Sequence, residues 1–151
     1  MITLQAVSVE DIPILFTHQD DPVVRSSGNI PIRERADFFA HWQRLLASDS
    51  ILKRGIWSDG QLIGSIACFE RNGLHEIGYA IARQYWGKGI ASEALRLFLL
   101  LTTDRPLSAR VTKYNYPSLR VLQKNGFLIT GEDLFVASDG RKLAEYVLTL
   151  S

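Results

Sequence analysis

Apolar residues recur along the chain with two spacings, and their order predicts a mixed α/β fold. Alternation over residues 2–7 is typical of a strand, and helical spacing follows after Ser8 and again over residues 34–47. Turn signals at 58–60 and 71–73 then separate three antiparallel strands. A helix after Gly89 precedes a strand, a short helix and two strands. The predicted bounds from the first hairpin onward, apart from that helix, are 51–57, 62–70, 75–82, 107–112, 117–124, 127–135 and 143–150.

The same pattern predicts one domain over residues 1–151. The first helix is expected to end at Asp20-Asp21-Pro22, and the Ser, Gly and Pro residues up to Pro31 predict an irregular loop. No repeat, low-complexity tract or linker divides the chain. We therefore expect an α+β fold, with a central, mostly antiparallel twisted sheet of about seven strands and about four helices on its faces.

Composition and charge exclude several classes of function. The chain has 17 Lys and Arg against 16 Asp and Glu, so a net charge of +1 provides no large field to bind nucleic acid or an anionic membrane. The longest apolar run, residues 97–101, is far shorter than the roughly 20 residues of a membrane helix. The single cysteine, Cys68, forms neither an internal disulfide nor a thiolate metal site, and no secretory signal is visible. We expect a cytoplasmic protein without a metal.

The segment from Trp86 to Ala91 contains the clearest candidate for binding. Gly87 and Gly89 lie between a strand and a helix, where unpaired N–H groups and the helix dipole favour a phosphate, and Lys88 adds a positive charge. The spacing does not fit a nucleoside-triphosphate loop, because Arg83 stands where an earlier glycine is needed and Gly89 where a Ser or Thr should follow the lysine. It does not fit a dinucleotide fingerprint either, because Ser92 occupies the position of the third glycine. The glycines alone are equally compatible with a tight turn that binds nothing.

Two motifs resemble the GNAT superfamily of N-acetyltransferases. The first is Ile77-Gly78-Tyr79 followed by Tyr85-Trp86-Gly87-Lys88-Gly89-Ile90-Ala91 and Glu93-Ala94. The second comprises Asn115, Ser118, Arg120-Val121-Leu122, Lys124 and Gly126-Phe127. Together they are similar to the branch of RimJ- and RimL-like acetyltransferases, which modify the amino termini of ribosomal proteins. The similarity covers nearly the whole chain.

This resemblance implies an acetyl-CoA site between the fourth and fifth strands, which part in that fold. Main-chain groups of Tyr79, Ala80 and Ile81 would pair with the pantetheine arm. The pyrophosphate would bind the loop, and two residues of the short helix would lie near the thioester. The implied contacts are Trp86, Gly87, Lys88, Gly89, Ile90 and Ala91 for the loop, with Asn115 and Ser118 for the thioester end.

The implied reaction is attack of a neutral amine on the thioester, which gives an amide and free CoA. Glu76 is the preferred base, acting through water, although a solvated strand charge is an equally ordinary role. His75 and Glu70 are weaker candidates. An N–H near Tyr79 or Ala80 would stabilise the oxyanion.

The sequence departs from many relatives at the expected acid, because Leu122 replaces a frequent tyrosine. Ser118 is the substitute that the RimL-like branch suggests, and Asn115 lies beside it. A helix cap is an alternative role for Ser118. An α-amine with a pKa near ~7.7–8.0 and a thiol near ~8.5 need little proton transfer, so positioning alone is a further alternative.

The acceptor and the assembly are less constrained than the reaction. A protein amino terminus or a small-molecule amine fits, and the protein is expected as a monomer or homodimer. An alternative function is a non-catalytic acyl-CoA-binding or regulatory module, and another is a nucleotide-phosphate enzyme that uses the same loop. Trp42 and Cys68 are more consistent with core positions, and Asp21 with a helix end. Candidates for selecting the acceptor are Asp20, Asp21, Arg25, Asn29, Trp42, Trp57 and Tyr85.

Overall fold

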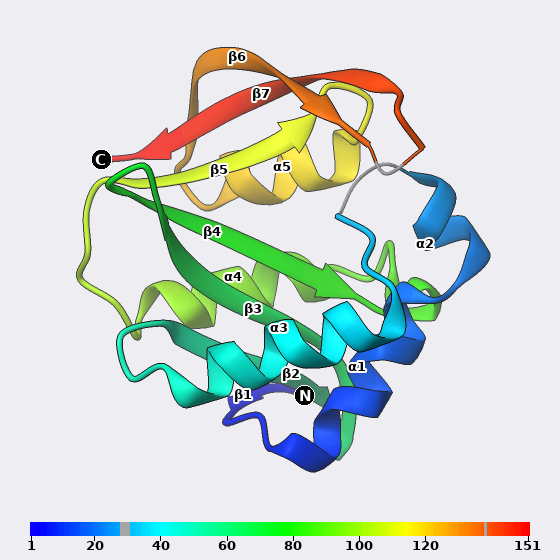
Figure 1. Cartoon of the computed structure of the whole chain (residues 1–151). Helices are drawn as coiled ribbons and strands as arrows, with labels where there is room; N and C mark the ends of the chain where they lie inside the picture. Colours follow the sequence, from blue (N-terminus) through cyan, green and yellow to red (C-terminus); the bar gives the residue numbers. More distant parts are fainter. Residues whose placement is uncertain (28–30, 138) are drawn as a thin grey trace.

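A seven-stranded mixed sheet forms the centre of the computed structural model, which describes residues 1–27, 31–137 and 139–151. Its strand order is β1-β2-β3-β4-β5-β7-β6, and only β4 and β5 are parallel neighbours (Figure 1). The sequence-based expectation of an α+β fold with seven strands is therefore confirmed. The strands are β1 (Ile2–Gln5), β2 (Leu52–Ser58), β3 (Gln61–Arg71), β4 (Leu74–Ile81), β5 (Leu107–Thr112), β6 (Leu128–Val136) and β7 (Lys142–Leu150).

Helices cover both faces of this sheet. In Figure 1, α1 and α3 lie in front of the lower strands, whereas α4 and α5 lie behind the sheet. The described residues contain five α-helices, one more than expected, and two short 3-10 turns. They are α1 (Ile12–Gln19), α2 (Pro22–Ser27), α3 (Arg35–Ala47), α4 (Ile90–Leu99) and α5 (Tyr116–Lys124), with η1 (Val9–Asp11) and η2 (Arg83–Tyr85).

The additional helix is α2, in a stretch for which the sequence predicted a helix end and a loop. Pro22 is its first residue. Proline is tolerated there because an N–H at that position would have no acceptor within the helix. Asp21 caps it, since its Oδ1 accepts from the N–H groups of Val23 and Val24 at 2.9 and 3.3 Å. The same residues that end α1 therefore start α2. The rest of the predicted loop, at 28–30, is outside the described residues.

The β4 and β5 strands pair only where they begin. His75 is opposite Leu107 and Glu76 is opposite Ser108, and beyond these pairs the two strands diverge, as Figure 1 shows. Each strand is paired along its other side, β4 with β3 and β5 with β7. The sheet is thus two complete halves joined at one end. The expected separation between the fourth and fifth strands is present.

Two hydrophobic clusters fix the helices to the sheet. The larger joins α4 and α5 to one face and includes Leu95, Phe98 and Leu122, which are at most 1% exposed. The smaller joins α1 and α3 to the other face through Phe16, Phe38 and other residues. Alternation along each strand supplies both clusters, because successive side chains point to opposite faces. Within the described residues, no helix combines the length and the apolarity that crossing a membrane requires.

The larger cluster should dominate the stability of the fold. Phe98→Ala removes a ring that has 0% exposure, and we expect the free energy of unfolding to fall by about 3–5 kcal/mol. Leu100→Ala, in a residue that is 74% exposed at the end of α4, should change it by less than about 0.5 kcal/mol. Urea unfolding of both variants measures the difference, and equal losses would contradict this assignment of the core.

Candidate functional site

The loop between β4 and α4 contains two glycines in the left-handed conformation. Gly87 has φ +74° and Gly89 has φ +76°, and Gly89 is the N-cap of α4. A Cβ added to either would meet no atom within 4 Å, so it is the backbone conformation that requires glycine. The first N–H groups of α4 lack intrahelical acceptors and lie at the positive end of its dipole. This geometry can bind an anion next to open space.

A cavity of about 290 Å³ adjoins the same helix start. It lies between α4 and the end of α5, and Asn125 connects the two helices by donating from Nδ2 to the carbonyl oxygen and Oγ of Ser92, both at 3.3 Å. Two cationic side chains, Arg96 and Lys124, line it, together with Gly89, Ser92, Glu93 and Asn125. No local sequence pattern places Arg96 here, because its neighbours across the cavity come from α5.

Trp86 and Lys88 have local contacts that shape this loop. The Trp86 indole Nε1 donates to the carbonyl oxygen of Ile81 at 2.8 Å, and the ring is 44% exposed. The Lys88 ammonium lies 5.5 Å from the centre of the Tyr85 ring. Ile90 and Ala91 form the first turn of α4. All six residues expected to bind a pyrophosphate therefore lie together at the start of α4.

The main chain of β4 presents alternate residues to the gap. The N–H of Ala82 donates to Ile63 on β3 at 2.8 Å, and the oxygen of Ala80 faces Gly64 on the same strand. Because the main-chain groups of successive strand residues point to opposite sides, those of Tyr79 and Ile81 face the gap toward β5. Ala80, the third residue expected there, points its main-chain groups toward β3. Tyr79 is thus the better placed of the two oxyanion candidates.

A side-chain hydrogen bond crosses the gap between β4 and α5. The Tyr79 hydroxyl and Ser118 Oγ are 2.6 Å apart. The Ser118 hydroxyl does not cap its helix: Asn115 is the N-cap, and its Oδ1 accepts from the Ser118 N–H at 3.3 Å. The capping alternative for Ser118 is therefore wrong, because the cap lies three residues earlier. Asn115 and Ser118 are brought together as expected.

The Tyr79 hydroxyl is a site feature that sequence reasoning missed. Burial raises the pKa of this phenol, although its hydrogen bond to Ser118 acts in the opposite direction. The group therefore stays protonated at neutral pH and can donate. The sequence suggested only main-chain contacts for Tyr79, because nothing in the order of residues shows that β4 and α5 meet across the gap.

Glu76 lies where β4 and β5 begin to part, in a network of opposite charges. Its carboxylate is 3.6 Å from Arg71 and 3.7 Å from Arg110. Arg110, on β5, also contacts Asp133 at 2.6 Å and Glu145 at 3.1 Å. The Glu76 side chain is only 17% exposed, so it is not an ordinary solvated strand charge. The Arg110–Glu76 pair bridges the two halves of the sheet.

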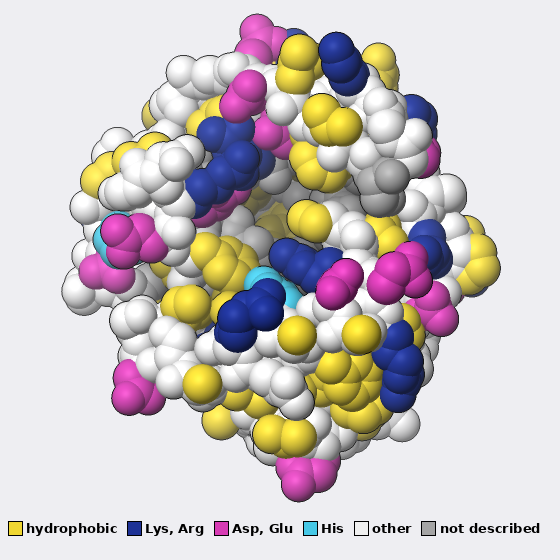
Figure 2. All heavy atoms as spheres, in the orientation of Figure 1, with side chains coloured by type: hydrophobic (Ala, Val, Ile, Leu, Met, Phe, Trp, Pro, Cys, Tyr) yellow, Lys and Arg dark blue, Asp and Glu magenta, His cyan; other side chains and the backbone are white. Residues whose placement is uncertain are grey.

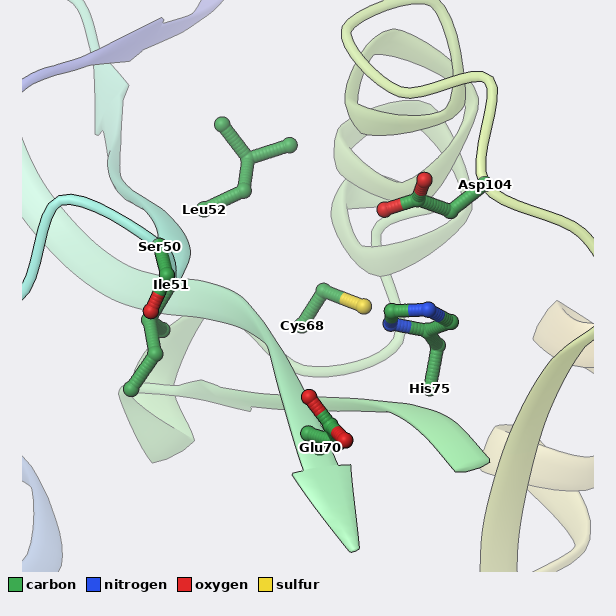
Figure 3. A pocket seen from close by; sticks show the side chains of 7 residues that line it. All are labelled: Ser50, Ile51, Leu52, Cys68, Glu70, His75 and Asp104. Carbon is green, nitrogen blue, oxygen red and sulfur yellow. The ribbon is translucent and has the colours of Figure 1, made fainter. Parts of the chain in front are cut away.

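The weaker base candidates, His75 and Glu70, lie in a different place. They line a cavity of about 80 Å³ with Cys68 and Asp104, at the end of β4 remote from the glycine loop (Figure 3). Adjacent strand residues face opposite sides, so His75 and Glu76 are on different faces of the sheet. Cys68 is buried, and burial followed by the Asp104 charge raises the pKa of its thiol. Cys68 is thus a buried, protonated thiol, as expected.

Most residues considered for acceptor selection have structural partners. Trp42 is 5% exposed in the smaller cluster, which confirms its expected core position, and Trp57 packs against that cluster. Asp21 caps α2 and contacts Arg83 at 3.0 Å. The remaining pairs are Asp20 with Arg25 at 3.2 Å and the Tyr85 hydroxyl with Gln61 at 3.0 Å; Asn29 lies outside the described residues.

The described part of the chain places no three His, Cys, Asp or Glu side chains so that they could hold a metal ion. The site is built instead from main-chain groups, hydroxyls, carboxylates and guanidiniums.

Comparison with known proteins identifies the class of domain. Residues 2–128 match a family model described as an acetyltransferase (GNAT) domain. The chain is 30% identical over 139 residues to the SPbeta prophage-derived uncharacterized N-acetyltransferase YokL of Bacillus subtilis strain 168, covering 87% of this chain and 78% of that protein.

Solved structures share the fold at lower identity. Mycobacterium smegmatis RimJ, in complex with CoA-disulfide, has a TM-score of 0.80 at 20% identity and covers 99% of this chain and 81% of its own. The microcin C7 self-immunity acetyltransferase MccE, in complex with acetyl-CoA and AMP, has a TM-score of 0.79 at 16% identity, with coverages of 99% and 91%.

The hydrogen bond across the gap should be measurable as a coupling energy. Tyr79→Phe and Ser118→Ala each remove one partner, and we expect the double variant to lose about 0.5–1.5 kcal/mol less stability than the sum of the single variants. Urea unfolding of the four proteins gives this difference. Strict additivity would show that the two hydroxyls do not interact in solution.

Proposed function

Because the chain belongs to the GNAT family of acetyltransferases, we propose that it transfers the acetyl group of acetyl-CoA to a primary amine. The acceptor is the amino terminus of a protein or a small-molecule amine. The observation that carries the proposal is the parting of β4 and β5 beside the two left-handed glycines at the start of α4. A cytoplasmic location and a monomeric or homodimeric state complete the proposal.

Three parts of the described chain support a site for acetyl-CoA. The loop and first turn of α4 offer N–H groups to the pyrophosphate, with Lys88 nearby. Lys124 and Arg96, the latter paired with Glu93 at 2.5 Å, leave the adjoining cavity with a net positive charge, which favours the phosphates of the nucleotide end. The gap-facing main chain of Tyr79 offers the pantetheine arm a strand-like partner. The bound thioester supplies the acetyl group.

Three chain groups are suited to assist the transfer. Glu76 accepts the proton of the incoming ammonium, directly or through water. The Tyr79 N–H is directed at the position where oxyanion charge develops. Ser118, in contact with the protonated Tyr79 hydroxyl, delivers a proton to the leaving sulfur. Tyr79 and Ile77 pack in the larger cluster and Glu76 points to the other face, so proton removal and proton delivery are on opposite sides of the sheet.

The energetic demand on these groups is small for an α-amine. Its pKa near ~7.7–8.0 leaves a substantial neutral fraction at cellular pH, whereas a lysine amine with a pKa near ~10.4 depends more on a base to remove its proton. A thiol with a pKa near ~8.5 leaves without a strong acid. Holding the amine next to the thioester therefore supplies much of the rate. A protein amino terminus and a small-molecule amine both satisfy this chemistry.

Binding of CoA should depend on the conformation and charge of the glycine loop. Gly89→Glu places a carboxylate where the pyrophosphate is expected and forces a left-handed φ on a residue with a Cβ. We expect its dissociation constant for CoA, measured by calorimetry, to rise at least about tenfold. Gly73→Glu is the matched control, because Gly73 has φ +78° and an equally open turn at the other end of β4. Unchanged affinity in a folded Gly89→Glu protein would contradict the proposed site.

The base role predicts a change in the pH dependence of turnover. Glu76→Gln removes the proton acceptor, so the plot of kcat/KM against pH should change and follow only the ionisation of the free amine. Release of free thiol from acetyl-CoA measures the rate. Glu132→Gln, which disrupts an exposed pair with Lys113, should leave the profile unchanged. Identical profiles for wild type and Glu76→Gln would remove Glu76 as the base.

A further inference from the structure

A basic cluster lies on the same face of the sheet as Glu76. The His41 ring, on α3, is 6.4 Å from the ring of Phe69 on β3. Phe69 is directly opposite Glu76 in the β3–β4 pairing, and directly opposed residues share a face. Arg33, just before α3, and Arg44, within it, both act electrostatically on His41. These three side chains, Arg33, His41 and Arg44, are called the α3 cluster.

The positive charges of the α3 cluster have no ion-pair partner among the described residues. Among the described residues, neither Arg33 nor Arg44 has a carboxylate oxygen within 4 Å, whereas Arg25, Arg71 and Arg83 each have one. Burial and then the charge of Arg44 lower the pKa of Arg33, and Asp37 opposes them only at longer range. Arg33 is partly buried, whereas Arg44 is exposed. Two like charges that repel each other without an ion-pair partner are unfavourable, and an anion that binds to both relieves this repulsion.

The same two arginine charges affect the pKa of His41. Burial, followed by the charges of Arg33 and Arg44, lowers the pKa of His41 to about 4. The imidazole is therefore neutral at cellular pH and offers both a donor and an acceptor nitrogen. The cluster presents two positive charges and one neutral hydrogen-bonding ring.

The opposite side of this face has the reverse charge. Glu76, Asp133 and Glu145 surround Arg110, with Arg71 at the edge, so three carboxylates meet two guanidiniums. Figure 2 shows the surface hollowed on this face, with Lys, Arg and His side chains on the α3 side, acidic side chains next to them, and mixed charges along the other side. The α3 cluster contributes two positive charges to one side of the hollow, and the network around Arg110 contributes a net negative charge to the other.

We propose that the acceptor is a small amine that also carries an anionic group, a carboxylate or a phosphate, bound by Arg33 and Arg44 while its amine faces Glu76. This inference rests on the proposed function and specifies its substrate. A diamine, or an alkylamine without an anionic group, would leave the positive charge of the α3 cluster uncompensated. An amine with an anionic group at its other end compensates the charge on both sides of the hollow.

The test compares acceptors matched in length. Acetylation by the intact protein is followed with ω-amino carboxylates, aminoalkyl phosphates, and the corresponding alkylamines and diamines. We expect kcat/KM to be roughly ten- to a hundredfold higher for one of the series that carry an anionic group than for the alkylamines that lack one, as for a charge-assisted hydrogen bond. The carboxylate and phosphate arms show which anion the cluster binds. Equal rates across all series would overturn the inference.

Two variants localise the effect. Arg33→Gln and Arg44→Gln should each raise KM for the preferred anionic amine at least about fivefold, and leave KM for the matching alkylamine unchanged. Arg105→Gln removes an exposed arginine that hydrogen-bonds only to main-chain oxygens of Thr102 and Asp104, and should change neither value. A loss that is equal for both amines would overturn the assignment of the cluster to specificity.

A titration without acetyl-CoA separates this inference from the proposed function. In NMR spectra, the preferred anionic amine should raise the pKa of His41 from about 4 toward 6.5, because a bound anion offsets the two arginine charges, and the alkylamine should not. If the pKa rises but no amine is acetylated, the anion site stands and the proposed function fails. If alkylamines are acetylated as fast as anionic ones and the pKa stays near 4, the function stands and the anion site fails.

Discussion

The whole site depends on main-chain groups of β4 that have no strand to pair with. Pairing with β5 stops at Glu76 and Ser108, and after that point Tyr79 and Ile81 face a gap. Main-chain N–H and carbonyl groups need hydrogen-bond partners away from water. On the gap side, the described residues provide one such partner, the Trp86 indole, which donates to the carbonyl oxygen of Ile81. An extended ligand that enters the gap can pair with the rest. The fold thus leaves a place in its own sheet for a strand-like molecule, and the loop that follows β4 directs the N–H groups of α4 to the end of that place.

The parted strands also divide the chemistry between two faces. Side chains alternate along β4, so Glu76 points toward α1 and α3 while Tyr79 points toward α4 and α5. In the proposed mechanism, a base on one face and a hydroxyl pair on the other act on the same carbonyl from opposite sides without competing for space. The Arg110–Glu76 pair, at the closed end of the gap, connects the halves of the sheet at the point where this division begins. Charge therefore stabilises the end of the gap, and apolar packing stabilises its sides.

Local patterns predicted the elements and the glycine loop, because periodicity and turn residues act over a few positions. They failed at Asp21-Pro22, where a helix end and a helix start have the same residues, and at Ser118, where Asn115 three residues earlier is the cap. The Tyr79–Ser118 bond and the contacts of Arg110 join residues 23 to 39 positions apart, so no local pattern indicates them. Motif resemblance supplied the site residues and their location, whereas the side-chain partners depended on how the strands and helices meet.

Charge pairing gives a general reason why the acceptor side differs from the cofactor side. Elsewhere on the described surface, Arg25, Arg83 and Arg141 each lie within 4 Å of a carboxylate, which reduces their attraction for a mobile anion. At the start of α4, by contrast, the proposed phosphate site combines main-chain dipoles with Lys88, Lys124 and the paired Arg96, and it does not involve Arg33 or Arg44. Arg33 and Arg44 therefore are not required for the coenzyme, and they lie on the face opposite α4. Their unpaired charge on the acceptor face is accounted for by a second anion, one that enters with the amine.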